Sequence, residues 1–124
     1  MKLTPVLYTD EIETSLTFWV DRMGFTKTAE VPEGDRLGFA ILVNGAAELM
    51  LQTWASLDKD APGLVKQPQG GTALFIEVDD FDDTLRRIAG CDIALPDRTT
   101  FYGMREIGVR TPSGHVAVFA KHVK

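Results

Sequence analysis

The fold is decided by two similar stretches of sequence, KLTPVLYTD at residues 2–10 and TALFIEVDD at residues 72–80. Each begins with an apolar or alternating run typical of a β-strand, and each ends in aspartate, a residue that often begins a helix. A predicted helix follows in both copies and ends at a glycine, Gly24 in the first and Gly90 in the second. Three strand-like stretches then complete each copy. This order, present twice, predicts a duplicated βαβββ module.

The first module is expected over residues 1–54. Its helix is predicted to begin at Asp10, with Glu13 in the position from which a capping-box side chain reaches back. An apolar stripe at spacings of three and four residues then faces a sheet. Asn44 and Gly45 predict a hairpin turn in which both central residues have positive φ. Strands are expected over residues 25–31, 37–43 and 46–53.

The second module is expected over residues 71–124. Phe81, Leu85 and Ile88 form the apolar stripe of its helix. Residues 54–71 contain prolines and a glycine pair, so we expect a loop that links the two modules. With 124 residues the chain fits one α+β domain with a single core. The further strands of the second module are expected over residues 92–95, 103–110 and 116–121.

Composition excludes several classes of protein. With 44% hydrophobic and 25% charged residues, the chain belongs with folded globular proteins. It has no apolar run of about 20 residues and no signal-peptide pattern, so no membrane association is expected. The net charge of −5 argues against nucleic acid, whose phosphates select basic patches. A single cysteine, Cys91, cannot form an internal disulfide and favours a reducing cytoplasm.

Four short motifs carry a resemblance to a known family. SLTFW at residues 15–19, with MGF at 23–25, is similar to the helix signature of the vicinal oxygen chelate superfamily. ELMLQ at 48–52 and TPSGH at 111–115 resemble its fourth-strand motif and the turn before its last strand. The superfamily includes glyoxalase I, extradiol dioxygenases, fosfomycin-modifying enzymes and bleomycin-resistance proteins. The resemblance implies that the two βαβββ modules form a curled mixed sheet with a cavity, usually in a homodimer.

The positions at which metal-dependent relatives hold a divalent ion lack suitable ligands in this chain. The resemblance places those positions at Thr4, Met50, Ala73 and Val118. Alkyl side chains cannot bind the ion, and shifting the alignment by one or two residues brings in a single carboxylate, Glu48. We therefore expect no metal site and no cofactor.

The candidate site is instead a surface for a small organic ligand. Strand alternation places aromatic and polar side chains on the face that carries the family's metal positions. By resemblance to bleomycin-resistance proteins, residues 99–106 form an aromatic loop that closes the ligand groove. Arg105 and Glu106 alternate, so at most one of them faces the cavity, and Met50 and Phe75 have an equal interpretation as packing residues. The candidate ligand-binding residues are Tyr8, Met50, Gln52, Trp54, Phe75, Phe101, Tyr102, Met104 and Arg105.

Two functions follow from this pattern. The first is a metal-free binding protein resembling bleomycin-resistance proteins, which would sequester a planar or cationic ligand in a dimer-associated cavity and confer antibiotic resistance. The alternative is a glyoxalase-family enzyme of unknown substrate, with lyase, isomerase or dioxygenase-like activity. No residue is assigned as catalytic, because no pair of titratable groups has a spacing that demands acid–base chemistry. The candidate general bases for the alternative are Glu48, Glu77, Glu106 and His115.

Overall fold

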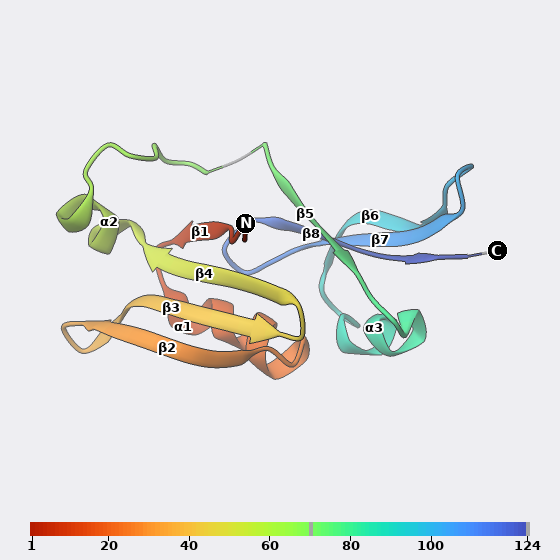
Figure 1. Cartoon of the computed structure of the whole chain (residues 1–124), viewed down its shortest axis with the longest axis horizontal. Helices are drawn as coiled ribbons and strands as arrows, with labels where there is room; N and C mark the ends of the chain where they lie inside the picture. Colours follow the sequence, from red (N-terminus) through yellow and green to blue (C-terminus); the bar gives the residue numbers. More distant parts are fainter. Residues whose placement is uncertain (70, 124) are drawn as a thin grey trace. The chain divides into compact units, whose positions relative to one another are not determined.

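A computed structural model describes residues 1–69 and 71–123 and divides the chain into two compact units. Unit 1 comprises Met1–Gly70 and unit 2 comprises Gly71–Lys124, so the boundary lies in the predicted linker. Each unit contains a four-stranded mixed sheet and a helix between its first two strands (Figure 1). The predicted α+β class and the duplication of the βαβββ module are confirmed.

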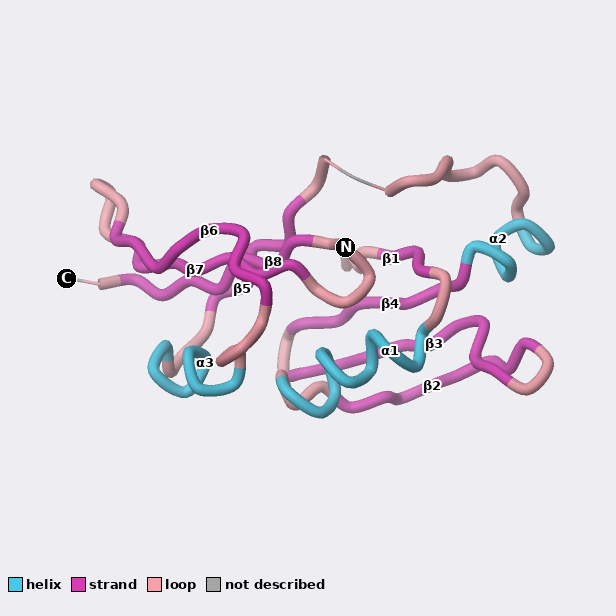
Figure 2. The backbone as a smooth tube through the Cα atoms, turned by 180° about the vertical axis from the view of Figure 1, so that it is seen from behind, coloured by secondary structure: helices cyan, strands magenta, loops and turns pink. Residues whose placement is uncertain are grey.

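In unit 1 the sheet has the order β1-β4-β3-β2, and only the β1–β4 pair is parallel. The first helix continues without a break into a π-helical segment, η1, and crosses one face of the sheet (Figure 2). A second helix, α2, follows β4. The elements are β1 (Val6–Thr9), α1 (Ile12–Leu16), η1 (Thr17–Arg22), β2 (Thr26–Glu33), β3 (Arg36–Asn44), β4 (Ala47–Thr53) and α2 (Trp54–Asp60).

The core of unit 1 lies between this helix and the sheet. Along β4, Leu49 and Leu51 are buried while their neighbours are half-buried, because successive strand residues face opposite sides of a sheet. The helix contributes the predicted apolar stripe, with Trp19 fully buried. The Trp19 ring meets the edges of Phe18 and Phe25 at centroid distances of 5.0 and 5.2 Å. These contacts fix which sheet face is covered and which is left open.

The predicted start of the first helix is wrong. Glu11, not Asp10, occupies the N-cap, and its side chain makes no capping bond. The backbone N–H of Glu11 donates instead to Thr9 Oγ1 at 3.3 Å. Glu13 does not form a capping box, because its Oε2 accepts a hydrogen bond from the backbone N–H of Leu37 at 2.8 Å. Tertiary contact with β3 therefore replaces the local cap, and the same bond lowers the pKa of Glu13.

The predicted turn geometry between β3 and β4 is also wrong. Asn44 pairs with Ala47, so the two-residue loop is Gly45-Ala46. Only Gly45 has a positive φ, 58°, and it occupies the first central position, as in a type II′ turn. The side chain of Asn44 donates to the carbonyl of Met23 at 3.1 Å and ties the hairpin to the end of the first helix.

The start of the predicted linker is helical. Thr53 ends β4 and caps α2, since its hydroxyl accepts a hydrogen bond from the backbone N–H of Ser56 at 3.1 Å. The expectation of a loop over residues 54–60 is therefore wrong. Thr53 gave only a weak helix-start signal, because the residue three positions later is Ser56 and not the Glu or Gln of a capping box.

In unit 2 the sheet has the order β5-β8-β7-β6, with β5 and β8 parallel. Asp80 caps its helix by accepting a hydrogen bond from the backbone N–H of Asp83 at 3.0 Å. Strand β6 runs four residues beyond its predicted end at Leu95, because an edge strand tolerates Pro96. No helix in the described part of the chain is long and apolar enough to span a membrane. The elements are β5 (Ala73–Glu77), α3 (Phe81–Arg87), β6 (Asp92–Thr99), β7 (Met104–Arg110) and β8 (Val116–His122).

Candidate functional site

The sheet of unit 1 has an open face opposite its helix. The register pairs Tyr8 with Gln52 and Gln52 with Phe39, so these three side chains form one row across β1, β4 and β3. Val6 and Met50 form the next row on the same face. Most of these side chains are half-buried, whereas those facing the helix are buried. The predicted common face of Tyr8, Met50 and Gln52 is confirmed.

A stacked aromatic pair lies at the end of this open face. The rings of Tyr8 and Trp54 have a centroid distance of 5.1 Å and an interplanar angle of 28°. Trp54 is the first residue of α2 and not a strand residue, so the Thr53 cap orients it toward Tyr8. The amide of Gln52 donates to Ser56 Oγ at 3.2 Å and holds the same turn of helix against β4. Trp54 is half-buried, which leaves part of its ring available to a ligand.

The side chain of Gln69 attaches the C-terminal end of the linker to β1, at the edge of the open face of unit 1. Its Oε1 accepts a hydrogen bond from the backbone N–H of Tyr8, and its Nε2 donates to the carbonyl of Val6, both at 3.0 Å. This side chain therefore occupies hydrogen-bonding groups on the outer edge of β1, which is an edge strand. Sequence reasoning missed Gln69, because a glutamine in a loop gives no signal that it will pair with a strand some sixty residues away.

The sheet of unit 2 also has an open face, and it carries charge. The register aligns Glu77 with Ala120 and Ala120 with Glu106, and Arg98 follows on β6. The side chain of Glu106 is only 5% exposed, its Oε1 accepts a hydrogen bond from Arg98 Nε at 2.8 Å, and the same oxygen lies 2.6 Å from Arg98 Nη2. Phe75 lies in the neighbouring row, paired with Val118. A buried carboxylate with an exposed arginine partner and an exposed aromatic ring thus share this face.

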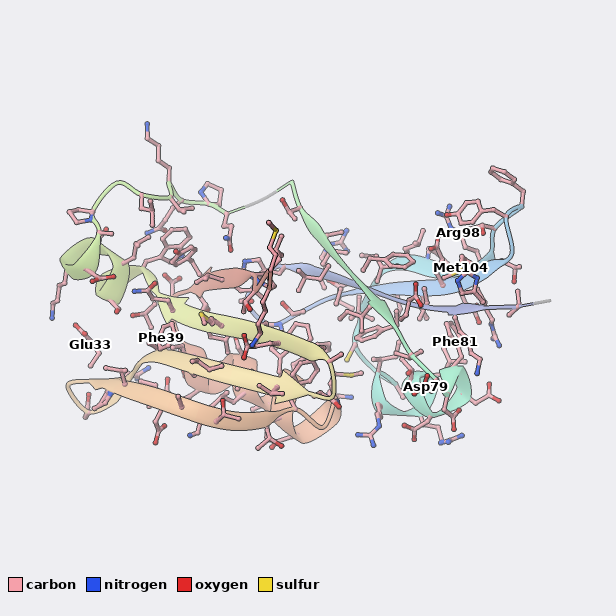
Figure 3. All side chains as sticks on the ribbon, viewed as in Figure 1. Glu33, Phe39, Asp79, Phe81, Arg98 and Met104 are labelled. Carbon is pink, nitrogen blue, oxygen red and sulfur yellow. The ribbon has the colours of Figure 1, made fainter. Side chains whose placement is uncertain are left out.

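Arg105 lies on the opposite face of the unit 2 sheet, toward α3. Its guanidinium lies 4.5 Å from the centroid of the Phe81 ring and pairs with Asp97 at 2.6 Å. The hydrogen bond between them lowers the pKa of Asp97 and raises that of Arg105. Figure 3 shows Arg98 and Met104 on the side of β7 away from α3, and Phe81 on the α3 side. Of the alternating pair, Glu106 therefore shares a face with Phe75, and Arg105 does not.

The family of the chain follows from its sequence together with this fold. The sequence model described as the Glyoxalase/Bleomycin resistance protein/Dioxygenase superfamily matches residues 3–119. The chain belongs to this superfamily. No curated protein matched the sequence.

Several solved structures share the fold at low sequence identity. TioX from Micromonospora sp. ML1 is 23% identical, with a TM-score of 0.77 over 99% of this chain and 100% of that one. A protein of unknown function from Agrobacterium tumefaciens str. C58 is 20% identical, with a TM-score of 0.80 over 99% and 95%. A glyoxalase-related enzyme from Fulvimarina pelagi is 20% identical, with a TM-score of 0.79 over 98% and 88%. These similarities show the fold and leave the activity open.

The superfamily's metal positions do not fit a divalent ion in this member. Thr4 Oγ1 donates to Glu48 Oε1 at 2.7 Å, and Lys2 Nζ lies 2.9 Å from the same oxygen. Both contacts lower the pKa of Glu48 and fasten the N-terminal segment to β4. Met50 offers only a thioether, and the corresponding positions in unit 2 carry alkyl groups. Among residues 1–69 and 71–123, no three His, Cys, Asp or Glu side chains come together as a metal site.

The predicted aromatic loop is the tip of the β6–β7 hairpin. Phe101 is fully exposed and Tyr102 is 60% exposed, and their rings meet edge to face at 5.0 Å. Thr100 closes the tip, since its hydroxyl accepts from the backbone N–H of Met104 at 3.0 Å. Met104 itself is buried. Within unit 2, the two rings are therefore exposed, whereas the methionine is buried.

His115 is a buried histidine at the turn before β8. Its Nδ1 lies 2.7 Å from Ser113 Oγ, which in turn lies 3.2 Å from Thr111 Oγ1. The backbone N–H of Thr111 donates to the carbonyl of His115 at 2.8 Å and closes the turn. Burial lowers the pKa of His115 below its ordinary value of 6.5. These contacts give His115 a structural role in the turn.

Acidification is expected to destabilise the protein through His115. In the unfolded chain this histidine binds a proton with a pKa near 6.5, whereas in the folded state it does so only at lower pH. Between the two values the unfolded state binds more protons, so the free energy of unfolding falls as the pH drops below about 6.5. Urea titrations at about pH 7.5 and about pH 5.5 measure this fall. In His115→Gln the fall should be smaller, and an equal fall in both proteins would contradict the assignment.

Proposed function

We propose that the protein is a metal-free binding protein that sequesters a planar or cationic small molecule, as bleomycin-resistance members of the superfamily do. The observation that carries the proposal is the stacked Tyr8–Trp54 pair beside the open face of unit 1. Planar ligands gain binding energy by stacking on aromatic rings in an offset arrangement. The half-exposed Trp54 ring offers such a surface, because Tyr8 supports it from one side.

The rest of the open face has the chemistry of a small-molecule site. Phe39, Ile41, Val6 and Met50 present apolar side chains that are half-buried and not packed away in the core. Gln52 adds an amide in the same row as Tyr8 and Phe39. Binding sites for organic ligands combine mainly apolar surface with a few placed polar groups. This composition favours recognition by stacking and one or two hydrogen bonds.

Two of the candidate general bases, Glu48 and Glu106, support binding better than catalysis. Glu48 is held by Thr4 and Lys2, and Glu106 is held by Arg98. A general base must reach a substrate proton within hydrogen-bond distance, and these carboxylates already hold fixed partners. No specific contact favours the alternative of a glyoxalase-family enzyme. We therefore retain binding without chemistry as the proposal.

A thermal-shift screen tests the proposed function. Bleomycin-type and other planar cationic compounds are added to the purified protein, and the melting temperature is recorded. A ligand that binds only the folded state raises Tm in proportion to the logarithm of its concentration. We expect at least one planar compound to raise Tm and to be recovered unchanged after incubation. Recovery of a converted product would overturn the proposal in favour of an enzyme.

We further propose that the binding form is a cytoplasmic homodimer. The side chain of Val31 is more than half exposed, and Val31 lies on β2, an edge strand of its sheet. Edge strands and open faces favour pairing with another copy, and small oligomers are most often two-fold symmetric. Light scattering at micromolar concentration should give twice the chain mass of 13.7 kDa. A monomer mass would contradict the proposed dimer.

A further inference from the structure

The open face of unit 2 places an exposed aromatic ring beside an unpaired carboxylate. Phe75 is 55% exposed although it lies in a strand, and Glu77 follows it on the same face of β5. Glu77 is exposed and makes no hydrogen bond or ion pair with the residues in the described ranges 1–69 and 71–123. Residues two apart on a strand lie roughly 7 Å apart, so the ring and the carboxylate can contact one small molecule.

The charged side chains on the open face of unit 2 determine whether it favours a cationic or an anionic ligand. Arg98 is paired with Glu106, and Arg110 lies 3.5 Å from Asp92. The arginines of the face are therefore each matched by an acid, whereas Glu77 has no cation. An added anion would meet guanidinium groups that are already neutralised. An added cation would meet an uncompensated carboxylate, on a protein whose net charge is −5.

The neighbouring strand leaves room for such a cation. Ala120 lies beside Glu77 on β8, and Glu106 lies beyond Ala120 on β7. Adjacent strands are about 4.8 Å apart, so the two glutamates are separated by roughly 10 Å at their Cα atoms, with only a methyl group between them. Both Arg98 contacts use Oε1 of Glu106. Val118, next to Phe75, completes an apolar floor.

We propose that this face binds an organic monocation, a quaternary or alkyl ammonium group attached to an apolar body. The ammonium group lies over the Phe75 ring and against the Glu77 carboxylate, and the apolar body rests on Val118 and Ala120. An aromatic face attracts a cation through its quadrupole, and the carboxylate adds a direct charge interaction. A divalent metal does not fit, because it requires several oxygen ligands. The inference rests on the proposed function of small-molecule binding and assigns the charge of the ligand.

An NMR titration with two matched probes tests the inference. Phenyltrimethylammonium carries the cation, and tert-butylbenzene is its uncharged counterpart of nearly the same shape. In ¹⁵N-labelled protein, the cation should shift amide signals of β5 and β8 around Phe75 and Glu77. The uncharged probe should bind about tenfold more weakly, since it loses both the cation–π contact with Phe75 and the charge interaction with Glu77.

Variants then identify the groups responsible. Glu77→Gln keeps the shape of the side chain and should weaken binding of the cation about fivefold while leaving the uncharged probe unaffected. Phe75→Leu should weaken binding of the cation about threefold or more. Asp92→Asn is the matched control, because it removes a paired carboxylate from the same face, and it should leave affinity unchanged. The spectrum of each variant without probe shows whether it is folded.

Three results would overturn the inference. The first is equal affinity for the charged and uncharged probes. The second is unchanged affinity for the cation in a folded Glu77→Gln variant. The third is a set of shifts confined to signals around Tyr8 and Trp54, which would nevertheless support the proposed function. Conversely, cation binding at Phe75 and Glu77 without any Tm increase from planar compounds would support the inference and remove the role proposed for the Tyr8–Trp54 pair.

Discussion

Replacing Arg98 with alanine is expected to lower the free energy of unfolding by about 2–3 kcal/mol. The variant leaves the carboxylate of Glu106 buried without the guanidinium that now donates a hydrogen bond to it from Nε and forms an ion pair with it through Nη2. A charge that stays buried without a partner costs far more than the pair contributed. The cost stays below that of a fully buried pair, because the Arg98 side chain is 56% exposed and water can take part of its place. Urea unfolding measures the difference.

A second ion pair in the same sheet provides the control for Arg98→Ala. Arg110 lies 3.5 Å from Asp92, and both side chains are more than half exposed. Surface pairs of this kind contribute about 0–1 kcal/mol, so Arg110→Ala should have a small effect. Adding Glu106→Gln to Arg98→Ala should recover part of the lost stability, because the buried group is then neutral. Equal destabilisation by Arg98→Ala and Arg110→Ala would show that Glu106 does not depend on its partner.

Replacing Trp54 with alanine is expected to weaken binding of a planar ligand by at least about tenfold. The variant removes the ring that stacks on Tyr8 and offers its other side to the ligand. Truncating an aromatic residue in the centre of a binding surface commonly reduces the binding free energy by about 2 kcal/mol or more, which corresponds to about a thirtyfold loss of affinity. Calorimetry with the compound that gives the largest Tm increase in the screen measures the change.

Leu64→Ala is the matched control for Trp54→Ala. Leu64 is an exposed apolar residue of the same linker, 68% accessible, and it lies outside the open face. Its removal should leave affinity unchanged. Tyr8→Phe keeps the ring and should retain most of the binding. If the folded Trp54→Ala variant binds the ligand as tightly as the parent protein does, the stacked pair is not the ligand surface.

The sequence was sufficient for the fold because its signals are local and repeated. Strand alternation predicted that Met50 and Gln52 share one face, and the structure agrees, with Leu49 and Leu51 buried on the other face of β4. The helix of unit 2 begins at its predicted aspartate cap, Asp80. These features depend on neighbouring residues, so propensity and periodicity predict them.

The candidate site was only partly predictable because its important contacts are long-range. Trp54 reaches Tyr8 from a helix that formed where a loop was expected. Gln69 binds β1 from the end of the linker. The ion pair that covers Glu106 depends on the register of β6, which shifts between Leu95 and Arg98. A register shift changes which side chain meets which partner, and no local pattern predicts it.

The most direct test of metal-free binding at the aromatic pair is calorimetry on protein treated with a chelator and then dialysed. We expect one ligand to bind per chain, with the same affinity before and after chelation and with or without added zinc or magnesium. We also expect an unchanged Tm after chelation, since a metal bound only to the folded state would have stabilised the protein. Binding that disappears on chelation and returns with a divalent ion would contradict the account, because Thr4, Met50, Ala73 and Val118 supply no ligand set for one.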